Sequence, residues 1–387
     1  MRLISVEPTP SPNSMKLNVD ERLPAGRRAA YTPDRAAEAP EPLRSLLAID
    51  GVKGVFRTAD FIALDRKPGA DWQRILAEAS KLFESAEGEG VLADGAAGPD
   101  ASFGEARVYV QTYRGIPMQV RVKIGDREAA RAALPDAFAA AVREAAGATL
   151  IMERRLEEYG VRYGEPDEIA AEVAAELTAA YPAERLRELV DAARAAGPAE
   201  AGAAPQPYVR PRPLTAEELD AALRAPDWQT RYAALERTQP EPELLPLLAR
   251  ALRDENSSVR RLAVVYLGDL RIPEALPHLL DALKDRTPAV RRTAGDTLSD
   301  LGDPAAAPAM IEALRDPNKL VRWRAARFLY EAGGEDAVPA LREAAQDEEF
   351  EVRLQARIAL ERIERGEEAA GSVWQQMTAM RESGRDA

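Results

Sequence analysis

Arginine and aspartate are the residues of this sequence whose types and spacing could do chemistry. Five arginines recur at intervals of 29 and then 31 residues, in WQTRYAAL, SSVRRLAV, PAVRRTAG, KLVRWRAA and FEVRLQAR: Arg231, Arg260, Arg291, Arg322 and Arg353. An aspartate stands six residues before each of the last four: Asp254, Asp285, Asp316 and Asp347. A carboxylate in a turn can cap the next helix and can also pair with a guanidinium group. We therefore predict a structural ladder of arginine–aspartate pairs, within one repeat or between neighbours.

The composition excludes most other site chemistry. The 387 residues include no cysteine and a single histidine, His278. Thiolate nucleophiles, disulfides and cysteine-held zinc or iron–sulfur sites are therefore excluded. No neighbour in the sequence forms a catalytic dyad with His278. We expect no catalytic, cofactor-binding or metal-binding residues and no enzyme activity; the alternative is a carboxylate-, lysine- or tyrosine-based site in the middle of the chain.

The elements that position these arginines are paired helices. A repeat of about 31 residues, in five copies over residues 214–366, is typical of an α-solenoid. The leucines at matching positions, Leu267, Leu298, Leu329 and Leu360, are predicted to build the core between repeats. Thr215 and Glu218 form a capping box that begins the region. The pattern resembles HEAT-like repeats of the phycobiliprotein-lyase type.

That resemblance implies a concave surface lined by the second helix of each repeat. The residues there that lie outside the repeat pattern are candidates for binding a partner: Arg261, Arg292, Asp296, Trp323, Arg324 and Arg327. An aromatic side chain among arginines is typical of a protein-binding hot spot. The alternative interpretation is ordinary helix surface, or core for Trp323. The same arginines could bind nucleic acid, but the net charge of −13 opposes contact with a phosphate backbone.

The first 87 residues predict a small α/β domain. LISVEP and SMKLNV alternate as strands do, GVKGVFR and DFIALDR predict a hairpin, and WQRILAEASKLF has helical spacing. TPSPNSMKLNV, LLAIDGVKGVFRTADFIAL and the helix that opens at Trp72 resemble the N-terminal domain of NifU-like (Nfu) scaffold proteins. That family holds its cluster on a separate Cys-x-x-Cys domain, so the resemblance implies a protein-docking module. Lys16 and Phe61 lie on its most recognisable segments. They are candidates for binding a partner; the alternative is that they have a structural role in the turns and the core.

A second small α+β domain is predicted over residues 103–196, between a linker at 88–102 and a proline- and alanine-rich linker at 197–213. ARVYVQTYRGIPMQVRVKIG predicts a hairpin and TLIMERRLEEYGVRYG a further strand. REAARAAL, DAFAAAVREAAG, PDEIAAEVAAELTAAY and AERLRELVDAARAAG predict helices. Arginines and tyrosines such as Arg114, Arg154 and Tyr159 could form an anion-binding surface. Because Glu153, Glu157 and Glu158 stand among them, we favour a salt-bridged face.

The order of these parts predicts a multidomain α+β protein and resembles, over nearly the full chain, the firmicute family of conserved virulence factor C-like proteins. We predict a non-catalytic adaptor whose NifU-like domain and concave repeat surface bind protein partners, with a link to iron–sulfur protein assembly or to regulation of expression. No signal-peptide region and no apolar run of membrane-spanning length occurs, which indicates a cytoplasmic bacterial protein without a membrane partner. Residues 367–387 are expected to form a tail or a cap on the last repeat, and the oligomeric state is left open.

Overall fold

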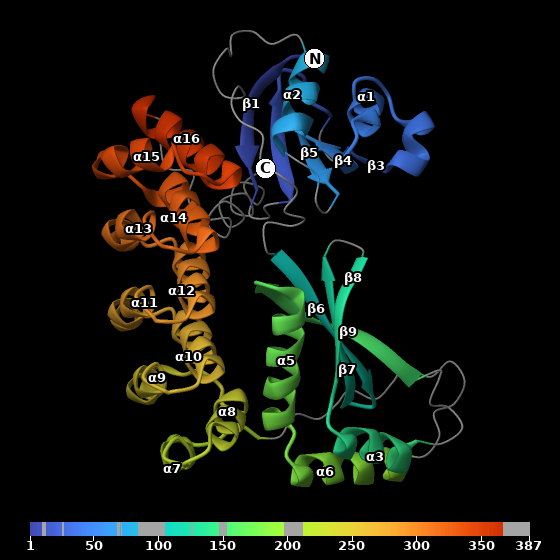
Figure 1. Ribbon diagram of the computed structural model, residues 1–387, viewed down its shortest axis with the longest axis vertical. Helices are drawn as coiled ribbons and strands as arrows, with labels where there is room; N and C mark the ends of the chain where they lie inside the picture. Colours follow the sequence, from blue (N-terminus) through green and yellow to red (C-terminus); the bar gives the residue numbers. More distant parts are fainter. Residues whose placement is uncertain are drawn as a thin grey trace. The chain divides into compact units, whose positions relative to one another are not determined.

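The computed structural model describes residues 1–9, 13–24, 27–67, 70, 72–83, 105–124, 127–146, 153–196 and 212–366. The segment 88–102, most of 197–213 and all of 367–387 lie outside the described residues, and so do the expectations of linkers and of a cap there. The chain divides into two compact units, residues 1–104 with 298–387 and residues 105–297. Each unit therefore combines an α/β domain with a part of the helical repeats (Figure 1).

The first unit begins with a five-stranded antiparallel sheet of order β1-β2-β5-β4-β3. Its elements in chain order are β1 (Leu3–Pro8), β2 (Ser14–Val19), β3 (Arg28–Tyr31), the 3-10 helix η1 (Pro33–Glu38), α1 (Leu43–Ala48), β4 (Val52–Thr58), β5 (Phe61–Arg66) and α2 (Trp72–Leu82). The expected strands, the expected β4–β5 hairpin and the expected helix in WQRILAEASKLF are present. The short strand β3 has no strong signal in the sequence and was not predicted.

Alternation along β2 explains the core of this domain. Met15, Leu17 and Val19 are buried, while the residues between them are half-buried on the opposite face. Ile62 and Leu64 of β5 are fully buried beside them, and α2 adds Trp72 to the same core. Two residues of the last repeat, Leu354 and Ile358 of α16 (Phe350–Glu364), belong to this core as well.

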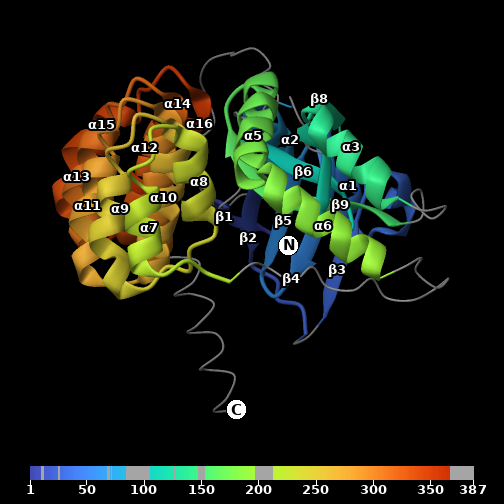
Figure 2. The same cartoon turned by 90° about the horizontal axis from the view of Figure 1, so that it is seen from below.

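The second unit begins with a four-stranded antiparallel sheet of order β8-β7-β6-β9. Its elements are β6 (Glu105–Tyr113), β7 (Ile116–Ile124), β8 (Arg127–Ala133), α3 (Asp136–Ala145), β9 (Arg154–Tyr163), α5 (Pro166–Ala180) and α6 (Ala183–Ala195). Val108, Val110, Val120 and Val122 share the buried face, as their alternation predicts. Helices α3 and α5 pack on the sheet, and α5 also lies beside α8 (Trp228–Glu236) of the repeats (Figure 2).

The prediction of a helix at REAARAAL is wrong, because this segment forms strand β8. Alanine and arginine favour helices, but β8 follows β7 closely and pairs with it from Gln119↔Ala133 to Ile124↔Arg127. Small side chains on β8 also allow α5 to pack against the strand. Tertiary pairing therefore overrides local propensity here.

The repeats alternate short and long helices. Those of the second unit are α7 (Ala216–Ala222), α8 (Trp228–Glu236), η2 (Pro242–Leu244), α9 (Leu245–Ala251), α10 (Ser257–Leu270), η3 (Pro273–Ala275), α11 (Leu276–Ala282) and the start of α12 (Pro288–Leu301). The first unit contains the end of α12, η4 (Pro304–Ala306), α13 (Ala307–Ala313), α14 (Lys319–Ala332), η5 (Glu335–Ala337), α15 (Val338–Ala344) and α16. The capping box of Thr215 and Glu218 is formed at the start of α7. The small N-terminal α/β domain, the second α+β domain and the C-terminal all-α solenoid are thus confirmed as the fold class.

Candidate functional site in the repeats and on the two α/β domains

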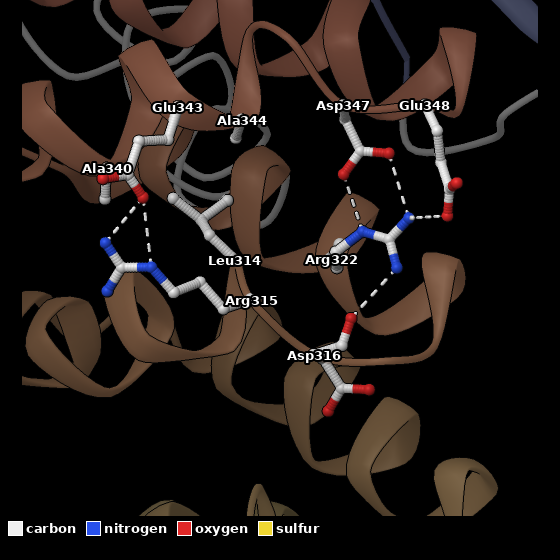
Figure 3. A pocket seen from close by; sticks show the side chains of 9 residues that line it. All are labelled: Leu314, Arg315, Asp316, Arg322, Ala340, Glu343, Ala344, Asp347 and Glu348. Atoms are coloured by element: carbon white, nitrogen blue, oxygen red, sulfur yellow. Dashed lines mark hydrogen bonds and ion pairs between the residues drawn. The ribbon is translucent and has the colours of Figure 1, made fainter.

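The arginine ladder joins neighbouring repeats. Arg322 of α14 donates from Nε to Asp347 Oδ2 at 2.7 Å and from Nη2 to Asp347 Oδ1 at 2.9 Å (Figure 3). Its Nη1 donates to the carbonyl oxygen of Asp316 at 3.0 Å. One guanidinium group therefore holds the turn before its own helix and the turn before the next long helix.

The same arrangement recurs in the second unit. Arg231 pairs with Asp254 at 2.6 and 2.9 Å, and Arg260 pairs with Asp285 at 2.7 and 3.0 Å. The sequence left open whether the arginines and aspartates pair within one repeat or between neighbouring repeats. These pairs join neighbouring repeats. Arg291 and Arg353 also donate from Nη1 to the turns before their helices, at Asp285 O and Asp347 O.

Each ladder aspartate also caps the turn in which it lies. Oδ1 of Asp254, Asp285, Asp316 and Asp347 accepts from the backbone N–H two residues later, at 2.7–2.9 Å. Burial by itself would raise the pKa of Asp285, but hydrogen bonds from Arg260 and from the Thr287 N–H lower it below its usual value. The carboxylates of Asp254, Asp285 and Asp347 therefore accept from a backbone N–H and from a guanidinium group at once.

A shallow pocket of about 440 Å³ lies beside the Arg322–Asp347 pair (Figure 3). Its charged lining includes Arg315, which donates to Glu343 Oε2 at 2.6 Å, and Glu348, which stands 3.8 Å from Arg322. The positive groups that line it thus have acidic partners in the lining itself. The arrangement favours repeat stacking over recognition of a charged small molecule.

Three residues expected on the concave surface are engaged within the second unit. Arg261 of α10 donates to Glu176 of α5 at 2.8 Å and is 7% exposed. Arg292 of α12 pairs with Asp296 at 3.1 Å and lies 3.8 Å from the ring centre of Tyr163. These contacts attach the repeats to the middle domain.

The other three concave candidates lie on α14. Trp323 is buried at 3% exposure, and the guanidinium group of Arg324 lies 5.3 Å from its ring centre. Arg327 donates to Glu331 at 2.8 Å, with both side chains buried. Binding of a partner by these six residues stays a prediction, and a partner would have to compete with the contacts that bury them.

Sequence reasoning missed a buried ionic network centred on Glu176. This carboxylate is fully buried and lies 2.8 Å from Arg261 and 3.5 Å from Arg162 of β9. Ser258 of α10 donates to the neighbouring Glu172 at 3.4 Å. A signal was available, because Glu176 occupies a core position of the helical pattern in PDEIAAEVAAELTAAY. A glutamate on a buried helix face requires a cationic partner from another element.

Burial and paired charges shift the acids of this network in opposite directions. Burial would raise the pKa of Glu176, but the charges of Arg261 and Arg162 outweigh it and hold the pKa below its usual value. Burial and the charge of Glu176 raise the pKa of Glu172. Burial also raises the pKa of Tyr232 in α8. The network thus contains one acid whose charge two arginines stabilise, beside a second acid whose pKa is raised.

Lys16 and Phe61 lie together on the outer face of the N-terminal sheet. Their neighbours Leu17 and Ile62 point into the core, and the Lys16 ammonium group lies 5.1 Å from the ring centre of Phe61. Both residues are half-buried. The structure therefore places them on the face opposite the core, which is where a docking residue must lie.

A buried ion pair attaches this domain to the last repeat. Arg66 of β5 donates from Nη1 to Glu351 of α16 at 3.1 Å, and the Arg66 side chain is 1% exposed. Its guanidinium group also lies 5.4 Å from the ring centre of Trp72 and donates from Nε to Asn13. The α/β domain and the last repeat therefore share both a core and a buried charge pair.

Two arginines of the middle domain, Arg114 and Arg121, are paired with acids. Arg114 holds Glu153 in a two-pronged ion pair at 2.5 and 3.0 Å, and Arg121 lies 3.6 Å from Glu128.

Among the residues that the structure describes, no group of three or more histidines, aspartates or glutamates could hold a metal ion. No helix in the described part of the chain is long and apolar enough to cross a membrane.

Fold and contacts together define a HEAT-type α-solenoid that carries two small α/β domains. Three family models match separate stretches of the chain: "Scaffold protein Nfu/NifU N terminal" at residues 4–88, "Virulence factor" at 111–190, and "HEAT repeats" at 216–288 and 276–361.

Curated relatives cover the whole chain. The uncharacterized protein YpgR of Bacillus subtilis is 54% identical over 388 residues, which is 99% of this chain and 100% of the relative. Conserved virulence factor C of Staphylococcus haemolyticus is 42% identical, covering 97% of this chain and 99% of the relative. Among solved structures, the complex of CpcE and CpcF of phycocyanin lyase from Nostoc is 26% identical, over 42% of this chain and 70% of that chain, with a TM-score of 0.35. The chain belongs to the family of conserved virulence factor C and YpgR proteins, which confirms the resemblance found in the sequence.

Proposed function

We propose that this protein is a non-catalytic adaptor of the bacterial cytoplasm. Its N-terminal domain binds one protein partner through the outer face of the sheet around Lys16 and Phe61. The concave face of the repeats, near Trp323 and Arg324, binds a second. The domain limits expected from the sequence, 1–87, 103–196 and 214–366, describe the parts that carry these roles.

One observation carries this proposal: each α/β domain is tied to the repeats by a buried ion pair. Arg66–Glu351 joins the first domain to α16, and Arg261–Glu176 joins the second to α10. Charged groups buried in this way hold domains in a defined orientation, since an unpaired member would cost several kcal/mol. A rigidly mounted domain keeps its outer face available, and this supports an adaptor built on the repeats.

The link to iron–sulfur proteins passes through the partner. The chain has no cysteine, so cysteine thiolates of its own cannot bind a cluster. The match to the Nfu/NifU N-terminal family model supports a docking role for this domain. We therefore propose that the first partner is a protein of iron–sulfur assembly or one of its clients.

The two alternative functions have weaker support. Nucleic-acid binding needs arginines whose charge is available, whereas Arg261, Arg292 and Arg327 each face an acid of this chain. An enzyme needs perturbed acids beside a substrate, and Glu172 and Glu176 do have opposite pKa shifts. The pairing of Glu176 with two arginines is a structural role, and it is sufficient to explain those shifts.

The experiment compares three forms of the full chain as bait in native bacterial extract: wild type, K16E/F61A and K81E/L82A. The last is a matched control, because Lys81 and Leu82 are an exposed lysine and apolar residue of the same domain. We expect iron–sulfur assembly proteins among the retained proteins, with recovery reduced at least tenfold for K16E/F61A and unchanged for the control. Equal recovery by all three baits would reject the docking surface, and nucleic acid retained by all three would favour the alternative.

A further inference from the structure

Strand β9 is exposed in a way that the other strands of its sheet are not. It is the last strand in the order β8-β7-β6-β9, so one of its edges faces away from β6. Residues 154–159 are exposed without alternation, whereas β6 and β7 alternate between buried and open positions. Leu156 is 43% exposed and Val161 is 38% exposed. Both faces of the segment from Arg154 to Glu158 are therefore exposed, and its outer edge faces away from β6; further along the strand, Arg162 and Tyr163 lie against Glu176 and Arg292.

The backbone of the exposed segment is regular enough to accept another strand. Residues Arg154 to Glu158 pair in unbroken antiparallel register with Tyr113 to Tyr109 of β6. The register shifts only beyond Glu158, where Tyr159 is left out of the pairing. A regular edge strand presents a row of N–H and C=O groups that can pair with a further strand.

The sequence of this segment selects one kind of strand. Arg154, Arg155, Leu156, Glu157 and Glu158 carry two positive charges, one apolar residue and two negative charges. In antiparallel pairing with a second copy of itself, a two-fold axis through Leu156 puts Arg154 opposite Glu158 and Arg155 opposite Glu157. Opposite charges in directly facing positions of a sheet stabilise the pair.

Neighbouring registers are unfavourable. In an antiparallel pair, directly facing residues have their side chains on the same face of the sheet. A two-fold axis perpendicular to the sheet keeps each side chain on its own face, and successive residues lie on opposite faces. The axis must therefore pass midway between one residue and its own copy. An axis through Arg154 or Arg155 puts that arginine opposite its own copy, and an axis through Glu157 or Glu158 does the same for a glutamate. Facing like charges destabilise a strand pair. Among these five positions, only Leu156 gives a register without such a clash.

We propose that this chain forms a homodimer in which the β9 strands of two copies pair antiparallel about Leu156. The two four-stranded sheets then form one continuous eight-stranded sheet. Charged residues on an edge strand usually prevent self-association, but here their order makes the edge complementary to itself. The pairing does not require the surface around Lys16 and Phe61, so loss of partner binding there leaves it intact.

Charge reversal in the full-length protein tests the pairing. We expect sedimentation velocity to show a dimer for the wild type at tens of micromolar. R154E/R155E gives an all-acidic segment and E157R/E158R an all-basic one, and each raises the dimer dissociation constant at least tenfold. A one-to-one mixture of the two variants restores the dimer, because each strand then faces the opposite charge along its length. Misfolding of either variant could not produce this rescue.

Introduced cysteines test the register, since the natural chain has no thiol. Facing Cα atoms of antiparallel strands are about 4.5–5.5 Å apart, within disulfide range. Under mild oxidation L156C should form a disulfide-linked dimer by itself. R154C and E158C should each stay unlinked alone and form a linked heterodimer when mixed, because each residue is about 14 Å from its own copy in this register. R131C, on the other edge strand β8, is the control and should stay unlinked.

The outcomes separate the pairing from its alternatives. A monomeric wild type over the whole concentration range overturns the proposal, and so does a dimer that persists in both charge-reversed variants. A dimer that R131C traps and L156C does not would place the interface on β8 instead. Linkage of R154C with itself would contradict the Leu156 axis.

Discussion

Arg66 and Glu351 stand 285 residues apart in the sequence, yet Arg66 Nη1 donates to Glu351 Oε1 at 3.1 Å. Leu354 and Ile358, on the same helix as Glu351, complete the core of the N-terminal domain. The last repeat and the first domain therefore fold as one unit. A protein lacking the first domain would expose these apolar residues, so point variants are better probes of function than deletions.

The Arg66–Glu351 pair is predicted to stabilise the first unit. Arg66→Ala leaves Glu351 without its buried partner and also removes the contact with Trp72. Breaking a buried pair costs roughly 3–5 kcal/mol. We expect a loss in that range for Arg66→Ala in urea unfolding, and a smaller loss for Glu351→Gln. In a double-mutant cycle the two losses should not add; simple additivity would show that the pair contributes no coupling.

The repeats were the part of the fold most accessible from sequence. Arg260 and Arg322 stand at fixed positions of a pattern whose period is set by two helices per unit, so their environment repeats as well. Most strands of the two sheets could be predicted from the sequence. The exceptions are the short strand β3, which has no strong signal, and β8, where REAARAAL has helical composition and only pairing with β7 makes it a strand.

The contacts that join the parts could not be predicted in the same way. Arg66 sits in a strand pattern and Arg261 in a helix pattern, and neither pattern specifies which distant acid each will face. For this reason Arg261 and Arg292 were assigned to an open concave surface, although both are buried against the middle domain. Glu176 carried a usable signal, since a buried helix position occupied by an acid implies a partner, but not which one.

The ladder pair is predicted to require arginine specifically. Arg322→Lys keeps the positive charge but cannot bond Asp347 twice and the Asp316 carbonyl at the same time. We expect thermal and urea unfolding to show a loss of about 2 kcal/mol. Arg315→Lys is the matched control, because Arg315 and Glu343 form an exposed pair at the same pocket. Exposed pairs contribute about 0–1 kcal/mol, so equal losses would contradict a special role for the ladder.

Close packing of α10 is predicted to depend on Gly268. A Cβ at this position would lie 2.2 Å from Thr297 Cγ2, although alanine favours a helix over glycine by about 1 kcal/mol. Gly268→Ala should therefore destabilise the wild type by about 1–2 kcal/mol. In a Thr297→Ala background the clash is removed, and the same change should raise stability. Calorimetric unfolding of the wild type, the two single variants and the double variant measures the stability change caused by Gly268→Ala in each background. A change of the same sign in both backgrounds would exclude the clash.

Glu176 and Glu172 are predicted to respond oppositely to neutralisation. Glu176→Gln removes the charge that pairs with Arg261 and Arg162, and at pH 7 it should cost roughly 3 kcal/mol. Glu172→Gln removes a charge that burial and Glu176 already disfavour, so stability at pH 7 should stay equal or rise. Comparable destabilisation by both variants would contradict the assignment of the ionised acid to Glu176.

The pH dependence of these two variants follows from the directions of the pKa shifts. The folded-state pKa of Glu176 lies below its usual value of 4.5, so the stability from its charge is complete above that value and is lost as the pH falls through the folded pKa. The gap between wild type and Glu176→Gln should therefore close only below about pH 4.5. The raised pKa of Glu172 acts in the other direction, because protonating it relieves the folded state as the pH falls from neutral. Any gain from Glu172→Gln should consequently shrink as the pH falls through the raised pKa toward the usual value of 4.5. Urea unfolding at intervals from about pH 3 to pH 8 measures both differences, and a gap that stays constant over this whole range for either variant would show that its carboxylate is not perturbed by the network.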